Sequence, residues 1–252
     1  MKLFNFWQFL LVAAVFVPLE RLFALRKEQR ILRAKWKLDL VYTFVNGALI
    51  TVGIMLVVLV AGNVFAYVVP EGLRTAVASQ PLLIQLVEAV VTADLLFYAA
   101  HRLFHSVPFL WKFHAVHHSI EEMDWLASAR VHPFDQIITK GASILPLLAL
   151  GFSGPVIAAH ALIYSWHSYL LHSNVNIKFG PLKWLVASPE YHHWHHANHQ
   201  EAYNQNYAAQ LSILDRLFRT LYLPQGKTPE KYGIDDPVPR GYLSQLISPA
   251  GK

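Results

Sequence analysis

Apolar segments with few or no charged residues recur along the first three quarters of the chain. Their lengths fit helices that cross a membrane, which need about 20 residues each. Four segments stand out: Leu3–Leu19, Leu40–Pro70, Pro81–Ala100 and Gly141–Ile177. Only the third contains Asp, Glu, Lys or Arg, at Glu88 and Asp94. The pattern therefore predicts an all-α integral membrane protein with about four transmembrane or hairpin helices.

Two of the segments are longer than one crossing requires. As one helix, Leu40–Pro70 would be about 46 Å long at 1.5 Å per residue, whereas a hydrocarbon core is about 30 Å thick. We expect this helix to tilt, or to break near Gly62. The sequence GFSGP, from Gly151 to Pro155, interrupts the last segment. Glycine and proline together indicate a turn, so this segment reads as a hairpin of two short helices that spans the bilayer or dips into it.

Composition and charge support a membrane protein. Hydrophobic residues make up 54% of the chain and charged residues 15%, against about 25% charged in soluble domains. The net charge of +5 is modest, but basic residues are concentrated in RKEQRILRAKWK, Arg26–Lys37. Because apolar segments flank this run, it indicates a cytoplasmic loop beside the membrane rather than a nucleic-acid patch. The absence of cysteine excludes disulfides, thiolate nucleophiles and iron–sulfur clusters.

The basic loop also predicts the orientation. No small-x-small cleavage site precedes it, so we interpret Leu3–Leu19 as a membrane helix rather than a signal peptide. With the loop in the cytoplasm, the third segment returns there near His101, and the hairpin returns there near His172. We therefore expect a multi-pass protein with a cytoplasmic, histidine-rich helical cap, in a bacterial inner membrane rather than the endoplasmic reticulum.

All fourteen histidines lie between His101 and His199, and their spacing repeats. HRLFH places His101 and His105 at i, i+4. HAVHH and HHWHH each contain the triplet H-x-x-H-H, which comprises His114, His117 and His118 in the first and His192, His195 and His196 in the second. Residues three and four apart share a face of a helix. Each triplet can therefore aim two or three imidazoles at one point.

A bound metal is the best interpretation of these triplets. A lone i, i+4 pair is often ordinary helix surface, and a metal-scavenging tract would be exposed and low in complexity. Here the clusters interleave with tryptophans and lie at the ends of apolar segments. The triplets, the pair and His172 supply nine imidazoles, too many for one ion and suitable for two first-row metals. A bis-histidine haem needs only two ligands and does not explain repeated triplets.

Neutral imidazoles leave such a site strongly positive, which calls for carboxylates or bridging oxygen ligands. Asp94 lies seven residues before His101 on the same helical face, inside a membrane segment, where an ionisable residue is a functional candidate. Glu121, Glu122 and Asp124 follow the first triplet and are either further candidates or solvated residues.

In this ordered set of motifs the sequence resembles the fatty acid hydroxylase / sterol desaturase superfamily of membrane di-iron enzymes. The matching elements are HRLFH, HAVHH, the histidine of LLHSN, HHWHH, NY at Asn206–Tyr207 and DRLFRT at Asp215–Thr220. They cover about Asp94 to Tyr222. Arg219 stands where the family often has glycine.

The resemblance implies a ligand set, residue by residue. The metal ligands it implies are His101, His105, His114, His117, His118, His167, His172, His192, His195 and His196. His132, in RVHP, is similar to a motif of sterol-modifying members and is a candidate catalytic residue beside Asp94. We assign His193 to the surroundings of the metals, His160 to packing in the hairpin and His199 to the surface.

The resemblance also implies an activity: two irons and O2 that hydroxylate or desaturate a lipid, with zinc as a substitute in preparations. Sterol, fatty acyl, sphingoid, alkyl ether and carotenoid substrates all fit these motifs. Because the chain has no dinucleotide-binding motif and no cysteine, we expect a separate electron donor, a ferredoxin with its reductase or a cytochrome b5-like protein.

Two other classes of protein compete with this interpretation. A metal transporter or sensor would place its ligands near mid-membrane, and a zinc hydrolase would carry a glutamate base as in H-E-x-x-H. We divide the chain into N-terminal membrane helices with the basic loop (1–93), a catalytic domain (94–222) and an irregular cytoplasmic tail (223–252).

Overall fold

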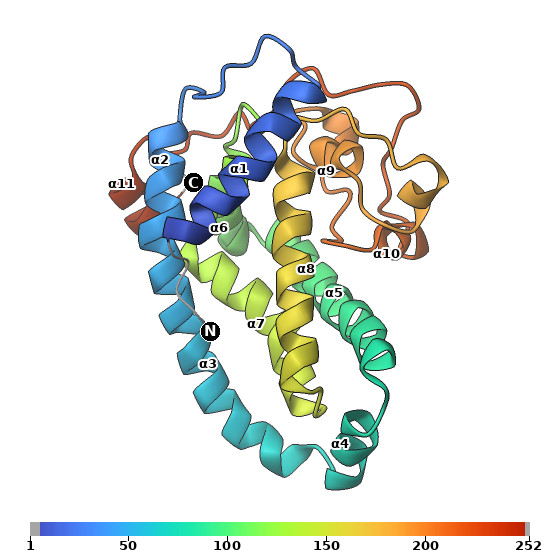
Figure 1. The fold of residues 1–252 in the computed structure, drawn as a ribbon. Helices are drawn as coiled ribbons and strands as arrows, with labels where there is room; N and C mark the ends of the chain where they lie inside the picture. Colours follow the sequence, from blue (N-terminus) through green and yellow to red (C-terminus); the bar gives the residue numbers. More distant parts are fainter. Residues whose placement is uncertain (1–5, 250–252) are drawn as a thin grey trace.

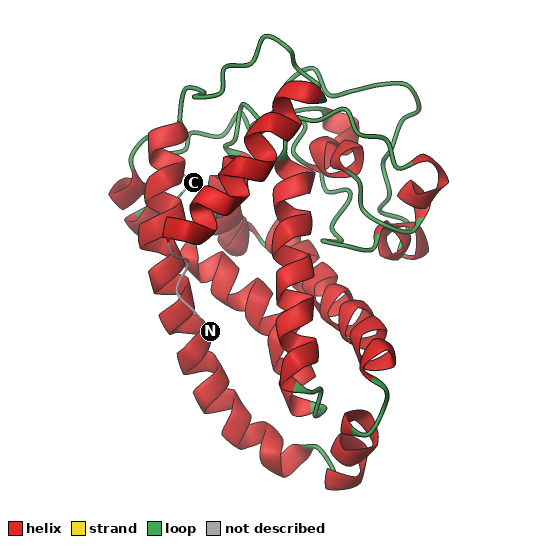
Figure 2. Ribbon diagram, viewed as in Figure 1, coloured by secondary structure: helices red, strands yellow, loops and turns green. Residues whose placement is uncertain are grey.

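The computed structural model describes residues 6–249, and this part of the chain is helical and contains no β-strand (Figures 1 and 2). The prediction of an all-α fold is confirmed. The longer helices are α1 (Phe6–Leu22), α3 (Gly47–Val68), α5 (Leu82–Ser106), α6 (Pro108–His118), α7 (Pro133–Ala149) and α8 (Gly154–His172). The shorter ones are α2 (Trp36–Val41), α4 (Glu71–Ala78), α9 (Pro189–His195), α10 (Ser212–Leu217) and α11 (Tyr242–Ile247).

Four helices, α3, α5, α7 and α8, form the elongated part of the molecule, and α4 closes its far end (Figure 1). Helix α7 contacts both α3 and α5, and α8 contacts α5. Small residues allow the close approach, since Ala89 and Ala93 of α5 are buried against Leu147 of α7 and Val156 of α8. At the other end lies the assembly that we call the cap: α6, α9, α10, α11 and the loops that join them.

Helices α2 and α3 form one long rod through a π-helical turn at Tyr42–Asn46. The rod continues past Gly62 to Val68, so the alternative of a break near Gly62–Asn63 is wrong. The irregularity lies instead in the π-helical turn, at the end of the rod that enters the cap.

The hairpin prediction is confirmed. Helices α7 and α8 are joined by the turn at Leu150–Ser153, where Gly151 has a φ of +83°. A Cβ atom at this position would lie 2.8 Å from the carbonyl oxygen of Arg74, which follows α4's first turn. Glycine is therefore required here both by the backbone conformation and by the close approach of α4.

Two stretches are long and apolar enough to cross a membrane, Trp36–Gly62 and Leu82–Ser106. Neither is a buried core helix, because only 11% and 28% of their most apolar windows are buried. On α3, for example, Met55, Leu59 and Val60 are more than half exposed. Such outward-facing apolar side chains fit lipid surroundings. The predicted segment Leu3–Leu19 begins outside the described residues, and α1, which covers the rest, is not among these candidate spans.

The basic loop packs onto the cap instead of extending freely into solvent. Gln29 donates a hydrogen bond to the carbonyl oxygen of Met123 at 2.7 Å, and Arg26 donates to those of Pro229 and Glu230. Arg33 is 2% exposed and forms ion pairs inside the protein. The loop and the histidine motifs therefore lie at the same end of the molecule, as predicted.

Candidate metal centre

Nine histidines form two adjacent groups between α5, α6, α8 and α9. Cluster A comprises His101, His105, His114, His118 and His195, and cluster B comprises His117, His172, His192 and His196. Within each cluster one nitrogen atom per residue lies within 4.8 Å of all the others. Eight of the nine side chains are buried. All nine belong to the ligand set predicted from the sequence.

Each triplet contributes to both clusters. Helix α6 sends His114 and His118, at i and i+4, to cluster A and His117 to cluster B, whereas the segment around α9 sends His192 and His196 to cluster B and His195 to cluster A. Helical geometry explains the division. At about 100° per residue, position i+4 lies about 40° from position i, but i+3 lies about 60° away on the other side.

Protein oxygen atoms fix the orientation of the imidazoles. The Nδ1 atoms of His101, His117, His172 and His195 lie 2.6 to 3.0 Å from the carbonyl oxygens of Tyr207, Arg130, Ser168 and Gln205. His114 Nδ1 lies 2.6 Å from Asp135 Oδ2. Since a carbonyl or carboxylate oxygen accepts, these five rings carry their proton on Nδ1. Their Nε2 lone pairs point into the clusters, as in protein sites where histidine binds a metal.

The Nε2 atoms cannot satisfy one another. His101 and His114 both donate through Nδ1, so their Nε2 atoms, 2.9 Å apart, are both acceptors. The Nε2 atoms of His117 and His172 are 3.3 Å apart and face each other in the same way. In cluster A, the Nε2 atoms of His105 and His195 are buried with no hydrogen-bond partner. Converging buried lone pairs of this kind suit a bound cation.

The distances between nitrogens fit a first-row metal. An ion with metal–nitrogen bonds of about 2.1 Å and ligand angles of 90° to 109° separates its ligand atoms by about 3.0 to 3.4 Å. The nitrogen pairs named above, together with His192–His172 at 3.0 Å and His196–His192 at 3.1 Å, fall at or close to this range. Both clusters are therefore suited to bind a metal ion.

The surroundings keep these imidazoles neutral. Burial, followed by the neighbouring histidines, lowers the pKa of His117, His118 and His192 well below the usual 6.5. Burial also lowers the pKa of His195 to about 4. A neutral imidazole is the form that binds a metal, so the rings need no deprotonation at pH 7.

Two carboxylates position the loop that supports cluster A. Asp94 accepts hydrogen bonds from the backbone N–H groups of Ala209, Gln210 and Leu211, at 2.6 to 3.1 Å. Asp215 accepts those of Tyr207 and Ala208 at 2.7 and 2.9 Å. The Asp215 carboxylate also accepts from the hydroxyl of Tyr191 in α9. The two residues thus hold in place the segment whose Tyr207 carbonyl orients His101.

A buried ion-pair network supports cluster B. Arg130, whose carbonyl oxygen orients His117, donates Nε and Nη2 to the two oxygens of Asp39 at 2.6 and 2.9 Å. Asp39 also pairs with Arg33 of the basic loop, and Arg33 pairs with Asp124 at 2.8 Å. Sequence patterns did not reveal this network, because its members are far apart in the chain. The available signals were an aspartate at the start of an apolar segment and Asp124, which follows the first histidine triplet.

The remaining predicted residues lie outside both clusters. His167 Nε2 is 2.8 Å from the carbonyl oxygen of Ala187, and His132 Nε2 is 3.1 Å from that of Leu246. His193 lies between the Ser173 carbonyl and the Tyr232 hydroxyl. His160 is buried against Gln210, and His199 is exposed. Asp94 reaches only backbone N–H groups among the described residues.

Two adjacent cavities lie beside the clusters. The smaller, of about 50 Å³, is lined by His101, His114, His117, His172 and His192. The larger, of about 310 Å³, lies between α3, α7 and α8. Ser128, Gln136, Tyr164 and Ser168 line both. The clusters therefore lie beside a cavity that shares residues with a larger one among the apolar helices.

Paired histidine clusters suited to metal ions, at one end of a helical bundle with candidate membrane spans, indicate a class of metal-binding membrane proteins, and comparison with known proteins specifies the family. The family model for fatty acid hydroxylase matches residues 86–220. This chain belongs to the fatty acid hydroxylase family. No solved structure matches the chain.

Curated relatives include two kinds of lipid oxygenase. The chain is 34% identical to an ornithine lipid hydroxylase from Rhizobium tropici over 169 residues, which cover 67% of this chain and 51% of the relative. It is 31% identical to the human alkylglycerol monooxygenase over 150 residues, 60% of this chain and 33% of the relative. The chain thus spans about half of the first relative and a third of the second.

Proposed function

We propose that this protein is an O2-dependent lipid hydroxylase or desaturase that holds one iron in each histidine cluster. The observation that carries the proposal is the convergence of nine imidazoles in two adjacent clusters, five of which line a cavity that shares residues with a larger one among the apolar helices. The names of the relatives, a lipid hydroxylase and a monooxygenase, support it. Five imidazoles in cluster A exceed the four positions of a closed zinc site.

The bound irons would supply the activation of O2. The contribution of the chain is to orient and shield. His101 and His114 are held by Tyr207 and Asp135, so the ligand geometry is set before a metal arrives. The apolar bundle excludes water and brings a lipid from the bilayer to the clusters along the cavity. Asp94 acts as a positioning residue for the 207–211 loop, and His132 as the N-cap of α7, whose Asp135 orients His114.

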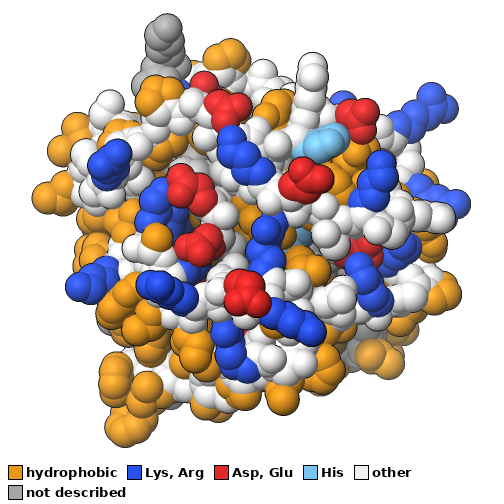
Figure 3. Space-filling view, turned by 90° about the horizontal axis from the view of Figure 1, so that it is seen from above, with side chains coloured by type: hydrophobic (Ala, Val, Ile, Leu, Met, Phe, Trp, Pro, Cys, Tyr) orange, Lys and Arg blue, Asp and Glu red, His pale blue; other side chains and the backbone are white. Residues whose placement is uncertain are grey.

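We also propose the membrane arrangement. Helices α3, α5, α7 and α8 form the membrane domain, and the cap lies in the cytoplasm with the basic loop, as the bias of basic residues favours. The view from above the cap supports this, since Lys and Arg side chains are spread over that face among Asp and Glu (Figure 3). We infer a bacterial inner membrane, and we retain the division into residues 1–93, 94–222 and 223–252.

The reaction needs electrons from outside the chain. Insertion of one oxygen atom of O2 into a C–H bond, with reduction of the other to water, consumes two electrons and two protons. Desaturation, which yields two waters, consumes the same number. We propose that a ferredoxin or cytochrome b5-like donor docks on the cap. Exposed basic residues that would steer an acidic donor include Arg216 and Arg219, and Lys178, which pairs with Glu190, is also exposed.

The test is a comparison of lipids from cells that express the wild-type protein or the His117→Ala variant. We expect the wild type alone to produce a lipid heavier by one oxygen atom or lighter by two hydrogens. Purified protein in lipid with NAD(P)H and a donor system should repeat the conversion and contain about two irons per chain, as the ligand number implies. Multiple turnovers without any donor protein would contradict the donor, and unchanged lipids in both settings would contradict the function.

A further inference from the structure

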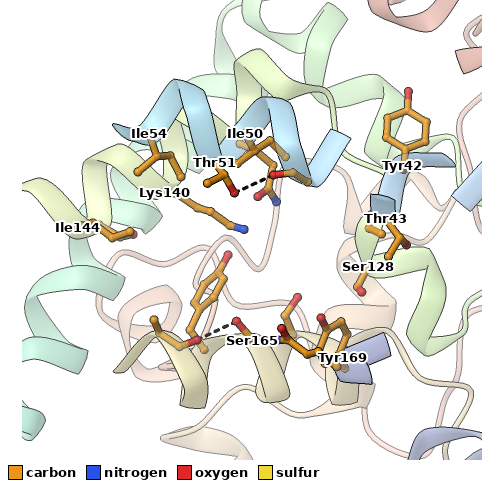
Figure 4. Close-up of a pocket in the computed structure, with 18 of the residues that line it drawn as sticks. Tyr42, Thr43, Ile50, Thr51, Ile54, Ser128, Lys140, Ile144, Ser165 and Tyr169 are labelled. Atoms are coloured by element: carbon orange, nitrogen blue, oxygen red, sulfur yellow. Dashed lines mark hydrogen bonds between the residues drawn. The ribbon is translucent and has the colours of Figure 1, made fainter. Parts of the chain in front are cut away.

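The surface of the larger cavity is mainly apolar, but it carries more polar groups than a hydrocarbon chain alone would need. Thirteen of the 21 residues that line it carry a hydroxyl, amide, imidazole or amine group. Figure 4 shows these side chains on three sides, with Thr51 from α3, Lys140 from α7 and Ser165 from α8 around the open space. A cavity that received only acyl chains would be lined by apolar residues.

Most of the hydroxyl groups in this cavity already donate within their own helices. Thr51 donates to the carbonyl oxygen of Gly47, and Ser165 donates to that of Ala161, both at 2.8 Å (Figure 4). Gln136 presents a buried Oε1 atom with no hydrogen-bond partner. These groups offer oxygen lone pairs to a polar ligand, but they supply no positive charge.

Lys140 supplies that charge. Its ammonium group points into the cavity (Figure 4), and no Asp or Glu is among the residues that line it. No ion pair or hydrogen bond of Lys140 occurs in the part of the chain that the structure describes, and its side chain is partly buried. A cation in such a place is costly unless an anion accompanies it.

The position of Lys140 relates it to the clusters. Asp135, which orients His114, lies five residues earlier on α7, about 7.5 Å along the helix axis. Gln136, one turn before Lys140, lines both cavities. A ligand anchored at Lys140 therefore extends past Gln136 toward the clusters.

We propose that Lys140 binds an anionic group of the lipid substrate, a carboxylate or a phosphate, and so selects acidic lipids. This inference rests on the proposed function and specifies its substrate class. The Lys140 ammonium donates to the anion, and the lone pairs of Thr51, Ser165 and Gln136 accept from hydroxyl or amine groups beside it. The site of oxidation then lies on the part of the lipid that extends from the anionic group past Gln136 toward the clusters.

The test measures binding rather than turnover, with the full-length protein in a nonionic detergent. The probes are oleate, dioleoyl phosphatidic acid and, as the neutral counterpart, oleyl alcohol. We expect Lys140→Met to weaken binding of at least one anionic probe about tenfold to a hundredfold. Binding of oleyl alcohol should stay within about twofold, because it lacks the anion. Lys140→Arg, which keeps the charge, should retain anion binding, and Lys227→Met, at an exposed lysine of the tail, should match the wild type.

The two anionic probes distinguish a carboxylate from a phosphate by which of them depends on Lys140. Unchanged affinity of the folded Lys140→Met protein for both, or an equal loss for oleyl alcohol, would overturn the inference. Failure of the proposed function is a separate result: Lys140-dependent anion binding would persist in a protein that oxidises no lipid in the cell assay.

Discussion

Clusters A and B share helices α6 and α9 but are supported from opposite ends of the chain. Cluster A adds His101 and His105 of α5 and depends on the 205–211 loop, which Asp94 and Asp215 hold. Cluster B adds His172 of α8 and depends on Arg130, which the N-terminal part of the chain holds through Asp39. The difference shows that each metal position can be disturbed separately, although the ligands interleave along the sequence.

The largest loss of activity is expected when a single histidine ligand is removed, in one variant from cluster A and in another from cluster B. His195→Ala in cluster A and His192→Ala in cluster B should each reduce lipid oxidation to background, because the chemistry needs both metals. Each should also lower bound metal from about two ions to about one, and the double variant should bind almost none. Metal analysis of the purified proteins provides the measurement.

His199→Ala is the matched control, since His199 belongs to the same motif but is exposed and lies outside both clusters. It should retain activity and metal. Full activity in either cluster variant, or loss of both metals from a single substitution, would remove the basis for treating the clusters as separate sites.

The next largest effect concerns stability. Asp39→Ala leaves Arg33 and Arg130 without their shared carboxylate in a buried site, and loss of one partner of a buried ion pair costs about 3 to 5 kcal/mol. We expect a clear fall of the thermal unfolding temperature in detergent. The remaining metal should be that of cluster A, because the Arg130 carbonyl orients His117 of cluster B.

The control for Asp39 is Asp235→Ala, which removes an exposed partner of Lys231 and should leave the unfolding temperature unchanged. Combination with His195→Ala identifies the surviving site: Asp39→Ala with His195→Ala should bind almost no metal. Two bound ions in the Asp39→Ala protein would show that cluster B does not depend on this network.

The smallest expected effect is a small increase in the unfolding free energy, from a substitution at Arg219 beside the Asp215 contacts that support cluster A. Arg219 adopts a φ of +61° next to Thr220, whose hydroxyl donates to Asp215 at 2.7 Å. A side chain in the left-handed region costs about 1 kcal/mol, which glycine avoids, although glycine loses more entropy on folding. Arg219→Gly should therefore stabilise the protein by up to about 1 kcal/mol, a rise of about 2 to 4 °C in Tm.

Arg216→Gly should instead lower the Tm. Arg216 lies inside α10, and glycine within a helix costs about 1 kcal/mol. A lower Tm for Arg219→Gly would mean that the arginine side chain contributes more than its backbone conformation costs. Both variants remove one positive charge, so opposite changes in Tm would show that the backbone conformation, and not the charge, causes the difference.

Local spacing explains what the sequence could reveal about the site. Apolar runs predicted the helices and the hairpin, and H-x-x-H-H predicted ligands, because both patterns are properties of a single helix. The division of each triplet between two clusters follows from the same geometry, since i+3 and i+4 diverge by about 100°. Our sequence prediction placed all three histidines of a triplet on one helix face, and it therefore did not foresee that they divide between two clusters.

Contacts between distant segments could not be predicted in this way. Asp39 and Arg130 are 91 positions apart, and although Arg130 belongs to RVHP, nothing in that motif indicates Asp39 as its partner. Asp94 was recognised as an unusual carboxylate in an apolar helix, but its partners are backbone N–H groups more than 110 positions later, which no side-chain pattern indicates. In the sequence, Lys140 lies just before an uncharged segment and resembles an ordinary flanking residue. Only the structure shows that it lines the larger cavity.

The π-helical turn at Tyr42–Asn46 fixes the rotational register between the two ends of the long N-terminal rod. On one side of it Asp39 faces Arg130 in the cap, and on the other Ile50 and Ile54 face the cavity. Deletion of one residue from a regular helix turns everything beyond it by about 100°. A shortened turn would therefore leave either the cap or the cavity with the wrong face of the rod, so this single wide turn lets Asp39 face the cap while Ile50 and Ile54 face the cavity.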